Sequence, residues 1–318
     1  MNKNIITYIA PIQGFTDFVY RKAFDKTFPG TDAFFIPYII LKNEQILKKY
    51  EKEILPENNP QKRAVPQVLV KNGAELVQLS KLLSSLGYTE VNLNMGCPYP
   101  MVTNRGKGAG LLPFPDQLKR MLDNFYERSN MKLSVKMRAG LHHPNEVEQI
   151  IPILNEFPIA EIIFHPRIAK QLYKGEILKQ TFIAAGKQSR IPLVYNGDIF
   201  SLTDFTEKQH EFATTENWML GRGVLKNPFL PSEIKAEYFP VEEKRKKRIE
   251  FHKRIFEGYS ESMDNPGNAL NKMKQFWSYF CYSFPNPQKT FKKIKKTSDL
   301  NQYQRETNSI FNENRDGN

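Results

Sequence analysis

Strand-like and helix-like segments alternate along roughly the first 220 residues, and this alternation restricts the fold more than any other feature. The strand-like segments are Ile5–Ala10, Ala33–Ile36, Pro66–Val70, Glu90–Asn94, Leu133–Lys136, Glu161–His165, Ile191–Tyr195 and Trp218–Leu220. Amphipathic, helix-like stretches lie between them at Phe18–Phe28, Ala74–Leu86, Gln117–Arg128, Glu146–Phe157 and Ile177–Gln188. Eight such units predict a parallel (β/α)₈ TIM barrel. A doubly wound sheet is the alternative, but no dinucleotide fingerprint follows the first strand.

Charge and cysteine content restrict the function. The chain has a net charge of +12 and a pI of about 9.4, which indicates a nucleic acid or an anionic membrane surface as partner. Two cysteines, Cys97 and Cys281, exclude a disulfide framework and a cysteine-rich metal site. The longest apolar run, Ala33–Leu41, is too short to span a bilayer, and the N-terminal apolar run is too short for a signal peptide. We therefore expect a cytoplasmic protein with no membrane segment, no metal and no obligate protein partner.

The stretch Val91–Leu112 has the features of a reactive site. Gly96-Cys97-Pro98 must end the fourth strand, because glycine and proline interrupt a ladder, so Cys97 is predicted on a turn at the strand tip. Arg105–Gly110 then supplies a glycine-rich, basic segment that we expect to be mobile. A lone cysteine is more often a small buried hydrophobe. Its position beside nearby cations favours a reactive thiol that meets a polyanion.

Polar residues and glycines follow six of the predicted strands, and in a barrel these strand ends form one rim where active sites lie. Each has an ordinary explanation as a turn or cap, but such residues at six strand ends favour a functional site. They are Pro11-Ile12-Gln13-Gly14, Asn94 with Cys97, Lys136 with Arg138, His165, Asn196-Gly197-Asp198 and Gly221-Arg222-Gly223.

The last two rim motifs indicate a phosphate-bearing ligand. Loops after strands seven and eight of a barrel often bind phosphate through backbone N–H groups, and Arg222 adds a bidentate donor. Lys136 could place a cation beside an electron-rich ring, and Gln67 could hydrogen-bond the edge of such a ring. A redox cofactor such as FMN fits this set.

The composition changes near residue 240, which predicts two domains, 1–240 and 241–318. The second part reads as helical and has 16 Lys and Arg against 10 Asp and Glu, a net charge of +6. Phe276, Phe280 and Phe284 predict one buried helical face. Phe291-Lys292-Lys293-Ile294-Lys295-Lys296 favours contact with nucleic-acid phosphates over a merely solvated face. Residues 307–318 are polar and are predicted to be disordered.

Taken together, these motifs resemble those of the tRNA-dihydrouridine synthases over nearly the whole chain. The resemblance rests on Ala10-Pro11-Ile12-Gln13-Gly14-Phe15-Thr16-Asp17, Asn94-Met95-Gly96-Cys97-Pro98 with Val102, Gly106 and Gly108, Val135-Lys136-Met137-Arg138, His165-Pro166-Arg167 with Tyr173, Asn196-Gly197-Asp198-Ile199 and Gly221-Arg222-Gly223. It implies an FMN-binding barrel followed by a small helical tRNA-binding domain. It also implies reduction of the C5–C6 double bond of uracil in tRNA, with NADPH as reductant.

The resemblance also implies roles for single residues. Cys97 matches the proton donor of the family, and Asn94, Arg138 and Tyr173 match residues that face the flipped uridine. The positions that match flavin contacts are Pro11, Ile12, Gln13, Gln67, Lys136, His165, Asn196, Gly197, Asp198, Gly221 and Arg222. Ile12 stands where the family usually has Met, and Gln13 where a smaller or acidic residue is common. Tyr99-Pro100 after Cys97-Pro98 is also unusual.

Two alternatives stay open at this point. A barrel flavoenzyme acting on a free pyrimidine, such as a dihydroorotate dehydrogenase, would share a flavin and a loop cysteine, but it leaves the basic tail without a purpose. A catalytically idle tRNA-binding protein would be expected to have lost its rim residues. Here Cys97, Lys136, His165 and Arg222 are all present.

Overall fold

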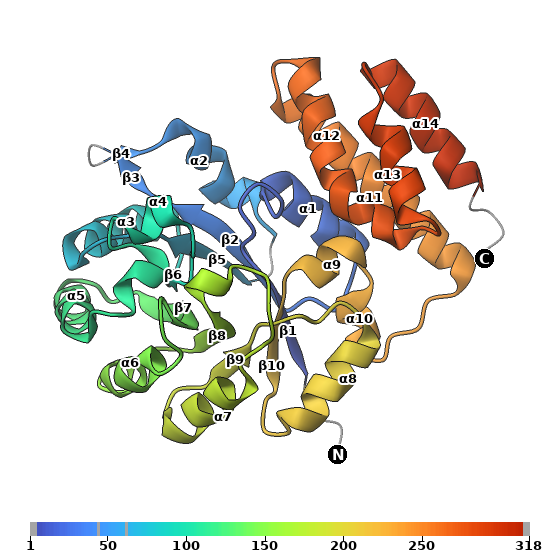
Figure 1. The fold of residues 1–318 in the computed structure, drawn as a ribbon. Helices are drawn as coiled ribbons and strands as arrows, with labels where there is room; N and C mark the ends of the chain where they lie inside the picture. The colour runs from blue at the N-terminus through green and yellow to red at the C-terminus, as the bar shows by residue number, and fades with distance from the viewer. Residues whose placement is uncertain (1–4, 43–44, 61–62, 314–318) are drawn as a thin grey trace.

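In the computed structural model of the chain, which describes residues 5–42, 45–60 and 63–313, eight parallel strands close into a barrel (Figure 1). The strands are β1 (Ile6–Ile9), β2 (Ala33–Ile39), β5 (Arg63–Val68), β6 (Glu90–Met95), β7 (Lys132–Gly140), β8 (Ile162–Ile168), β9 (Leu193–Tyr195) and β10 (Asn217–Leu220). The predicted TIM barrel is therefore confirmed, and the doubly wound sheet is excluded. β5 begins at Arg63, earlier than predicted. The charged side chain of Arg63 interrupts the apolar pattern by which the strand is recognised in the sequence.

Helices surround the barrel (Figure 1). They are α1 (Phe18–Thr27), α3 (Gly73–Ser85), α5 (Pro115–Arg128), α6 (Glu146–Leu154), α7 (Lys179–Gln188) and α8 (Leu202–Glu211). Each outer helix turns one apolar stripe to the strands, as α5 does with Leu118, Met121, Leu122 and Phe125. The hairpin β3 (Leu41–Lys42) and β4 (Gln45–Ile46) and helix α2 (Lys48–Ile54) lie between β2 and β5. Short helices α4 (Pro100–Thr103), α9 (Arg222–Lys226) and α10 (Leu230–Ile234) occupy loops that follow strands.

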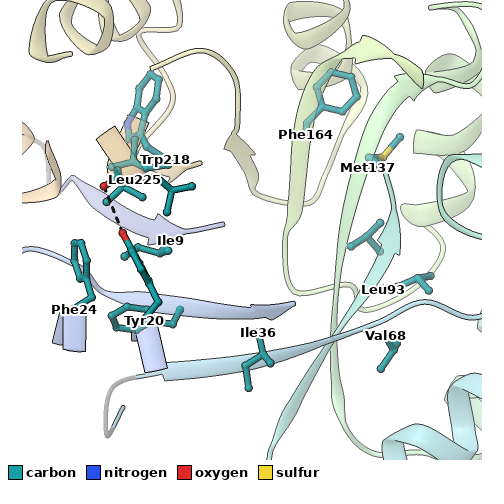
Figure 2. Packing of buried hydrophobic residues seen from close by; sticks show 14 of the residues in the cluster. Ile9, Tyr20, Phe24, Ile36, Val68, Leu93, Met137, Phe164, Trp218 and Leu225 are labelled. Carbon is teal, nitrogen blue, oxygen red and sulfur yellow. Dashed lines mark hydrogen bonds between the residues drawn. The ribbon is translucent and has the colours of Figure 1, made fainter. Parts of the chain in front are cut away.

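The main core lies between the strands and the helices. Outward-facing Ile9 lies beside the helix residues Tyr20 and Phe24, and Leu93 lies with Val68 and Met137 farther round the same core (Figure 2). A second, smaller cluster fills the inside of the barrel with the alternate strand residues, Tyr8, Phe35 and Ile163 among them. Successive side chains of a strand thus point alternately to the core under the helices and to the core inside the barrel.

The lower, amino-terminal end of the barrel interior is polar. Arg63 donates to Glu90 (2.6 Å) and to Glu161 (3.0 Å), and the Tyr8 hydroxyl donates to Glu161 (3.0 Å). Glu90 in turn accepts from Ser134, which accepts from Asn92. A ladder of satisfied polar groups therefore runs up the inside of the barrel to the rim.

The basic tail forms four helices: α11 (Val241–Ser262), α12 (Pro266–Phe280), α13 (Pro287–Lys295) and α14 (Leu300–Glu313). At its centre the Tyr303 hydroxyl accepts from Trp277 Nε1 (2.8 Å) and lies 2.6 Å from His252 Nε2. Burial lowers the pKa of His252 to about 3, so this ring is neutral and accepts the hydroxyl proton. Phe276, Phe280 and Phe284 are buried as predicted, but α12 ends at Phe280, and Phe284 reaches the same core from beyond the helix.

The predicted disorder from residue 307 on is wrong as far as Glu313. In α14, Tyr303, Thr307, Ile310 and Phe311 are buried on one face, at the spacing of an amphipathic helix. Most residues between these four are polar, so the sequence of this segment predicts disorder and its helical spacing is missed. Residues 314–318 lie outside the described residues. In the part of the chain that the structure describes, no helix is both long and apolar enough to cross a bilayer.

The four helices are fixed to the barrel through α1. The Phe251 ring of α11 packs between the rings of Tyr20, Phe24 and Phe28, with centroids 5.1–5.9 Å apart. Below them, Asp17 caps α1 and accepts from the Tyr259 hydroxyl (2.9 Å) and from Lys272 Nζ (3.0 Å). The loop that follows β1 is thereby tied to α11 and α12.

Candidate active site

One cavity of about 350 Å³ opens at the carboxyl ends of the barrel strands, and every site residue predicted from the sequence lines it. These residues are Pro11, Ile12, Gln13, Gln67, Asn94, Cys97, Lys136, Arg138, His165, Tyr173, Asn196, Gly197, Asp198, Gly221 and Arg222. Strand register produces this gathering, because Asn94 lies opposite Lys136 on β7, and Arg138 lies opposite His165 on β8. Their separate roles stay predictions.

Cys97 is held on a rigid turn. Its backbone N–H and that of Gly96 both donate to Asn94 Oδ1, at 2.9 and 3.0 Å. Its carbonyl accepts from Ala109 N (3.1 Å), and Gly108 approaches it so closely that a Cβ there would lie 2.8 Å from the carbonyl oxygen. The expectation of a mobile basic loop is therefore wrong for Gly108–Leu111, which forms a buried 3₁₀ turn beneath Cys97.

Cys97 is 8% exposed, and burial raises the pKa of its thiol above the ordinary value. A backbone hydrogen bond from Tyr99, the charge of Arg138 and a hydrogen bond from the Tyr38 hydroxyl lower this pKa but do not offset burial. The sequence left this balance open. With its pKa raised, the thiol keeps its proton at neutral pH.

The side-chain amides of Asn94 and Gln67 are oriented by the polar ladder inside the barrel. Asn94 Nδ2 donates to Gln67 Oε1 (2.6 Å), and Gln67 Nε2 donates to Asn92 Oδ1 (2.7 Å). Each amide nitrogen has a second N–H, and both side chains line the cavity. One donor on each can therefore point to a ligand.

Lys136, His165 and Asn196 form a polar group on the cavity floor, in which His165 and Asn196 are buried and Lys136 is partly exposed. Lys136 Nζ donates to Asn196 Oδ1 (2.7 Å), and His165 Nδ1 donates to the Asn196 carbonyl (2.6 Å). Burial lowers the pKa of Lys136 to about 7 and that of His165 well below its usual value. His165 is therefore neutral, and its Nε2 is a buried acceptor without a hydrogen-bond partner among the described residues.

Asp198 joins two arginines at the rim. Its backbone is in the left-handed region (φ +37°), and its carboxylate accepts from both Arg167 and Arg222 Nη2 (2.8 Å). The two guanidinium groups hold the pKa of this carboxyl below its usual value. Arg222, predicted as a bidentate phosphate donor, thus shares its charge with Asp198. The sequence reasoning gave Arg167 no role, although it stands in the quoted His165-Pro166-Arg167 motif.

Tyr173 lies between two cations. The guanidinium carbons of Arg138 and Arg222 lie 5.2 and 4.9 Å from its ring centroid. Arg138 also donates to the carbonyls of Gly96 (3.0 Å) and Ile168 (3.1 Å), so its position is fixed. Since Tyr173 is 47% exposed, it presents an oriented aromatic surface at the cavity mouth.

Comparison with known proteins identifies the family. The family described as "Dihydrouridine synthase (Dus)" matches residues 8–315. The chain belongs to the dihydrouridine synthase family. The family predicted from the motifs is thereby confirmed, and the chain is an enzyme.

Individual relatives agree with this family. The chain is 24% identical to the tRNA-dihydrouridine(16) synthase of Pseudomonas putida over 309 residues, which cover 92% of this chain and 93% of the relative. It is 26% identical to tRNA-dihydrouridine synthase B of Pasteurella multocida, over 70% of this chain and 67% of the relative. A solved structure, a variant of NCR from Zymomonas mobilis, is similar with a TM-score of 0.50 and 13% identity over 75% of this chain and 90% of that chain, which supports the barrel fold alone.

Membership of the dihydrouridine synthase family implies a flavin, and the cavity suits one. The unpartnered His165 Nε2 offers a buried acceptor, and Arg222 offers a cation to a phosphate. Lys136, whose pKa of about 7 leaves it partly protonated at neutral pH, offers an N–H donor to an electron-rich ring. Gln67 and Asn94 each retain a donor. The cavity wall is otherwise largely aromatic and aliphatic, as in most cofactor sites.

Several aromatic residues of this family member escaped the sequence reasoning. Tyr38, Phe15, Phe200 and Tyr279 all line the cavity. Tyr279 comes from α12, and its ring meets that of Phe15 edge-on with centroids 5.0 Å apart. Phe15 stands in the first quoted motif. No local signal marks Tyr279, because the tail helices reach the barrel mouth only in the folded protein.

Proposed function

We propose that this enzyme reduces the C5–C6 double bond of a uridine in tRNA to give 5,6-dihydrouridine, with FMN as its bound cofactor and NADPH as reductant. The observation that carries the proposal is the buried thiol of Cys97, which keeps its proton and lines the same cavity as the cation and amide groups suited to a flavin. Family membership across residues 8–315 and the printed names of the relatives support the same reaction.

Four side chains and two loops would hold the cofactor. Lys136 and His165 would contact the ring system, Gln67 would donate to its edge, and Arg222 with the loops at Gly197 and Gly221 would bind the phosphate. When bound, FMN would supply a hydride to C6 of the uracil. The buried cluster inside the barrel, which includes Ile163 and Met219, closes the floor of the cavity to bulk water.

The protein's own part in the reaction is to deliver a proton. The Cys97 Sγ–H bond breaks as a C–H bond forms at C5 of the uracil, which leaves a thiolate. Arg138 and the Tyr38 hydroxyl both stabilise that thiolate. The remaining Asn94 amide donor and the Arg138 guanidinium stabilise charge that develops on the C4 carbonyl.

The substrate follows from charge and shape. A net charge of +12 matches the phosphates of RNA, and a cavity at the end of a barrel can receive only a base that has left the stack. We also propose that residues 1–240 form the catalytic domain and 241–318 the tRNA-binding domain. A tRNA substrate is consistent with the predicted cytoplasmic location.

The first test concerns the cofactor and the product. The purified protein should be yellow, release FMN on heating, and form dihydrouridine in tRNA when NADPH is added. Lys136→Ala should retain less FMN, because the buried ring contact is lost. A colourless protein that takes up no added FMN would contradict the proposal. Product formation from free uridine but not from tRNA would favour the free-pyrimidine alternative.

A second test concerns Tyr38 and the thiol. Because the Tyr38 hydroxyl favours the thiolate, Tyr38→Phe should raise the pKa of Cys97 further. The pH at which iodoacetamide alkylates Cys97 at half its maximal rate should therefore move upward, and reoxidation of the flavin by tRNA should slow. Tyr99→Phe is the matched control, since its backbone donor to the thiol is unchanged. An unchanged alkylation profile in Tyr38→Phe would show that this hydroxyl does not act on the thiol.

A further inference from the structure

A second cavity of about 450 Å³ lies where the barrel mouth meets the tail helices. We call it the interdomain groove. It shares Phe15, Phe200, Arg222 and Tyr279 with the catalytic cavity and adds Lys226, Ser278 and Tyr282. The two cavities are therefore adjacent, with these four shared side chains between them at the barrel mouth.

The interdomain groove combines exposed aromatic surface with positive charge. Lys226 Nζ lies 4.2 Å from the ring centroid of Tyr282 and 4.8 Å from that of Phe200. The Tyr282 ring is 48% exposed, and its turn is fixed by a hydrogen bond from Ser283 Oγ to the Lys226 carbonyl (2.7 Å). Aromatic faces for bases and cations for phosphates are the two parts of a single-strand binding site.

We propose that the interdomain groove is a second nucleotide subsite, which binds the RNA nucleotide adjacent to the target uridine. The base packs against Tyr282, and the phosphate between the two nucleotides lies near Lys226 and Arg222. This inference rests on the proposed function, because a uridine that occupies the catalytic cavity stays covalently linked to its neighbour. The neighbour must leave the cavity through its mouth, and the groove begins there.

NADPH also carries a base and phosphates, but the observations favour RNA. The groove is bounded by α9 of the barrel and by α12 and the turn that follows it, so part of its wall belongs to the basic tail. A nucleotide next to a uridine in the catalytic cavity would lie at the mouth, beside the side chains that the two cavities share. A reductant needs contact with the flavin alone and has no need of the tail.

The test compares groove variants with matched surface variants of the intact enzyme. Tyr282→Ala and Lys226→Met should each lower kcat/KM for tRNA, with a loss of about 10- to 100-fold for Tyr282→Ala, the usual effect of one stacked base. Tyr282→Phe should restore most of the activity, because the aromatic face remains. Tyr238→Ala and Lys81→Met are the controls, since both side chains are exposed, both lie outside residues 241–318, and neither lines a described cavity.

Two further measurements separate the possible outcomes. The rate at which NADPH bleaches the flavin should be the same in Tyr282→Ala as in the wild type, and a slower rate would assign the groove to the reductant. The Kd for tRNA, measured on the same variants, does not depend on turnover. It therefore tests the groove even if the wild type forms no dihydrouridine, a result that would contradict only the proposed reaction. An unchanged Kd and an unchanged kcat/KM in Tyr282→Ala would overturn the subsite.

Discussion

Replacing Cys97 with alanine should slow the reoxidation of reduced flavin by tRNA about 10²- to 10⁴-fold, the usual contribution of a positioned general acid. The substitution removes the only group proposed to deliver a proton to C5, while the cofactor contacts stay in place. Reduction of the flavin by NADPH should therefore proceed at the wild-type rate. Stopped-flow absorbance of the flavin measures the two half-reactions separately.

Cys281→Ala provides the matched control. Cys281 is also buried, but it lies in the turn after α12 and does not line the catalytic cavity. Its substitution should leave both half-reactions unchanged. If tRNA reoxidised the flavin of Cys97→Ala at the wild-type rate, the thiol would be an ordinary loop residue and the proton would come from elsewhere.

The barrel could be predicted from the sequence because the patterns that indicate its strands and helices are local. Each strand begins or ends near a glycine, proline or polar residue, and parallel strands place their carboxyl ends on one rim whatever the details of packing. The order of the strands was therefore enough to predict that Asn94, Lys136 and Asp198 lie at one site. Arg63 shows the limit of this reasoning. A charged residue in the sequence predicts a loop, and its place in a strand is explained only by the ion pairs with Glu90 and Glu161 that form in the folded barrel.

Features that depend on burial or on contacts between distant residues could not be predicted from the sequence. The protonation of Cys97 depends on how deeply Gly108 and Tyr38 enclose it. The pairing of Arg222 with Asp198 depends on a left-handed backbone that the sequence does not specify. Tyr279 reaches the catalytic cavity through contacts between distant parts of the chain, among them the bonds of Asp17 to Tyr259 and Lys272, more than two hundred positions away.

The same contacts decide how the tail can be tested. Removing residues 241–318 would expose the rings of Tyr20 and Phe24 that Phe251 covers. It would also remove the hydroxyl and ammonium partners of Asp17, so the loop that follows β1 would lose its ties to the tail. Loss of tRNA binding after such a truncation would therefore say little about the tail's own contacts, and surface substitution is the better experiment.

Replacing Lys292, Lys295 and Lys296 with glutamine should weaken tRNA binding and make it less sensitive to salt. These three side chains are exposed on or just after α13, whereas Lys293 binds Glu313 (2.7 Å) and is left intact. Each phosphate contact contributes about 0.9 to the slope of log K against log salt, so three contacts contribute about 2 to 3. The loss of affinity between 50 and 200 mM salt should then be smaller by about 40-fold than in the wild type. Glutamine has a helix propensity close to that of lysine and places no acid in the last turn of the helix, where it would oppose the dipole.

A control of equal charge change decides whether position or net charge matters. Lys81, Arg120 and Lys187 are exposed on α3, α5 and α7, which lie around the barrel away from α11–α14 (Figure 1). Changing them to glutamine lowers the net charge by the same amount, and it should leave the salt slope and the Kd nearly unchanged. If the two triple variants changed the Kd and the salt slope equally, tRNA binding would depend only on the total charge of the protein. An unchanged slope in the α13 variant alone would remove this helix from the tRNA-binding surface, because a lysine that contacts a phosphate must release a counterion when it binds.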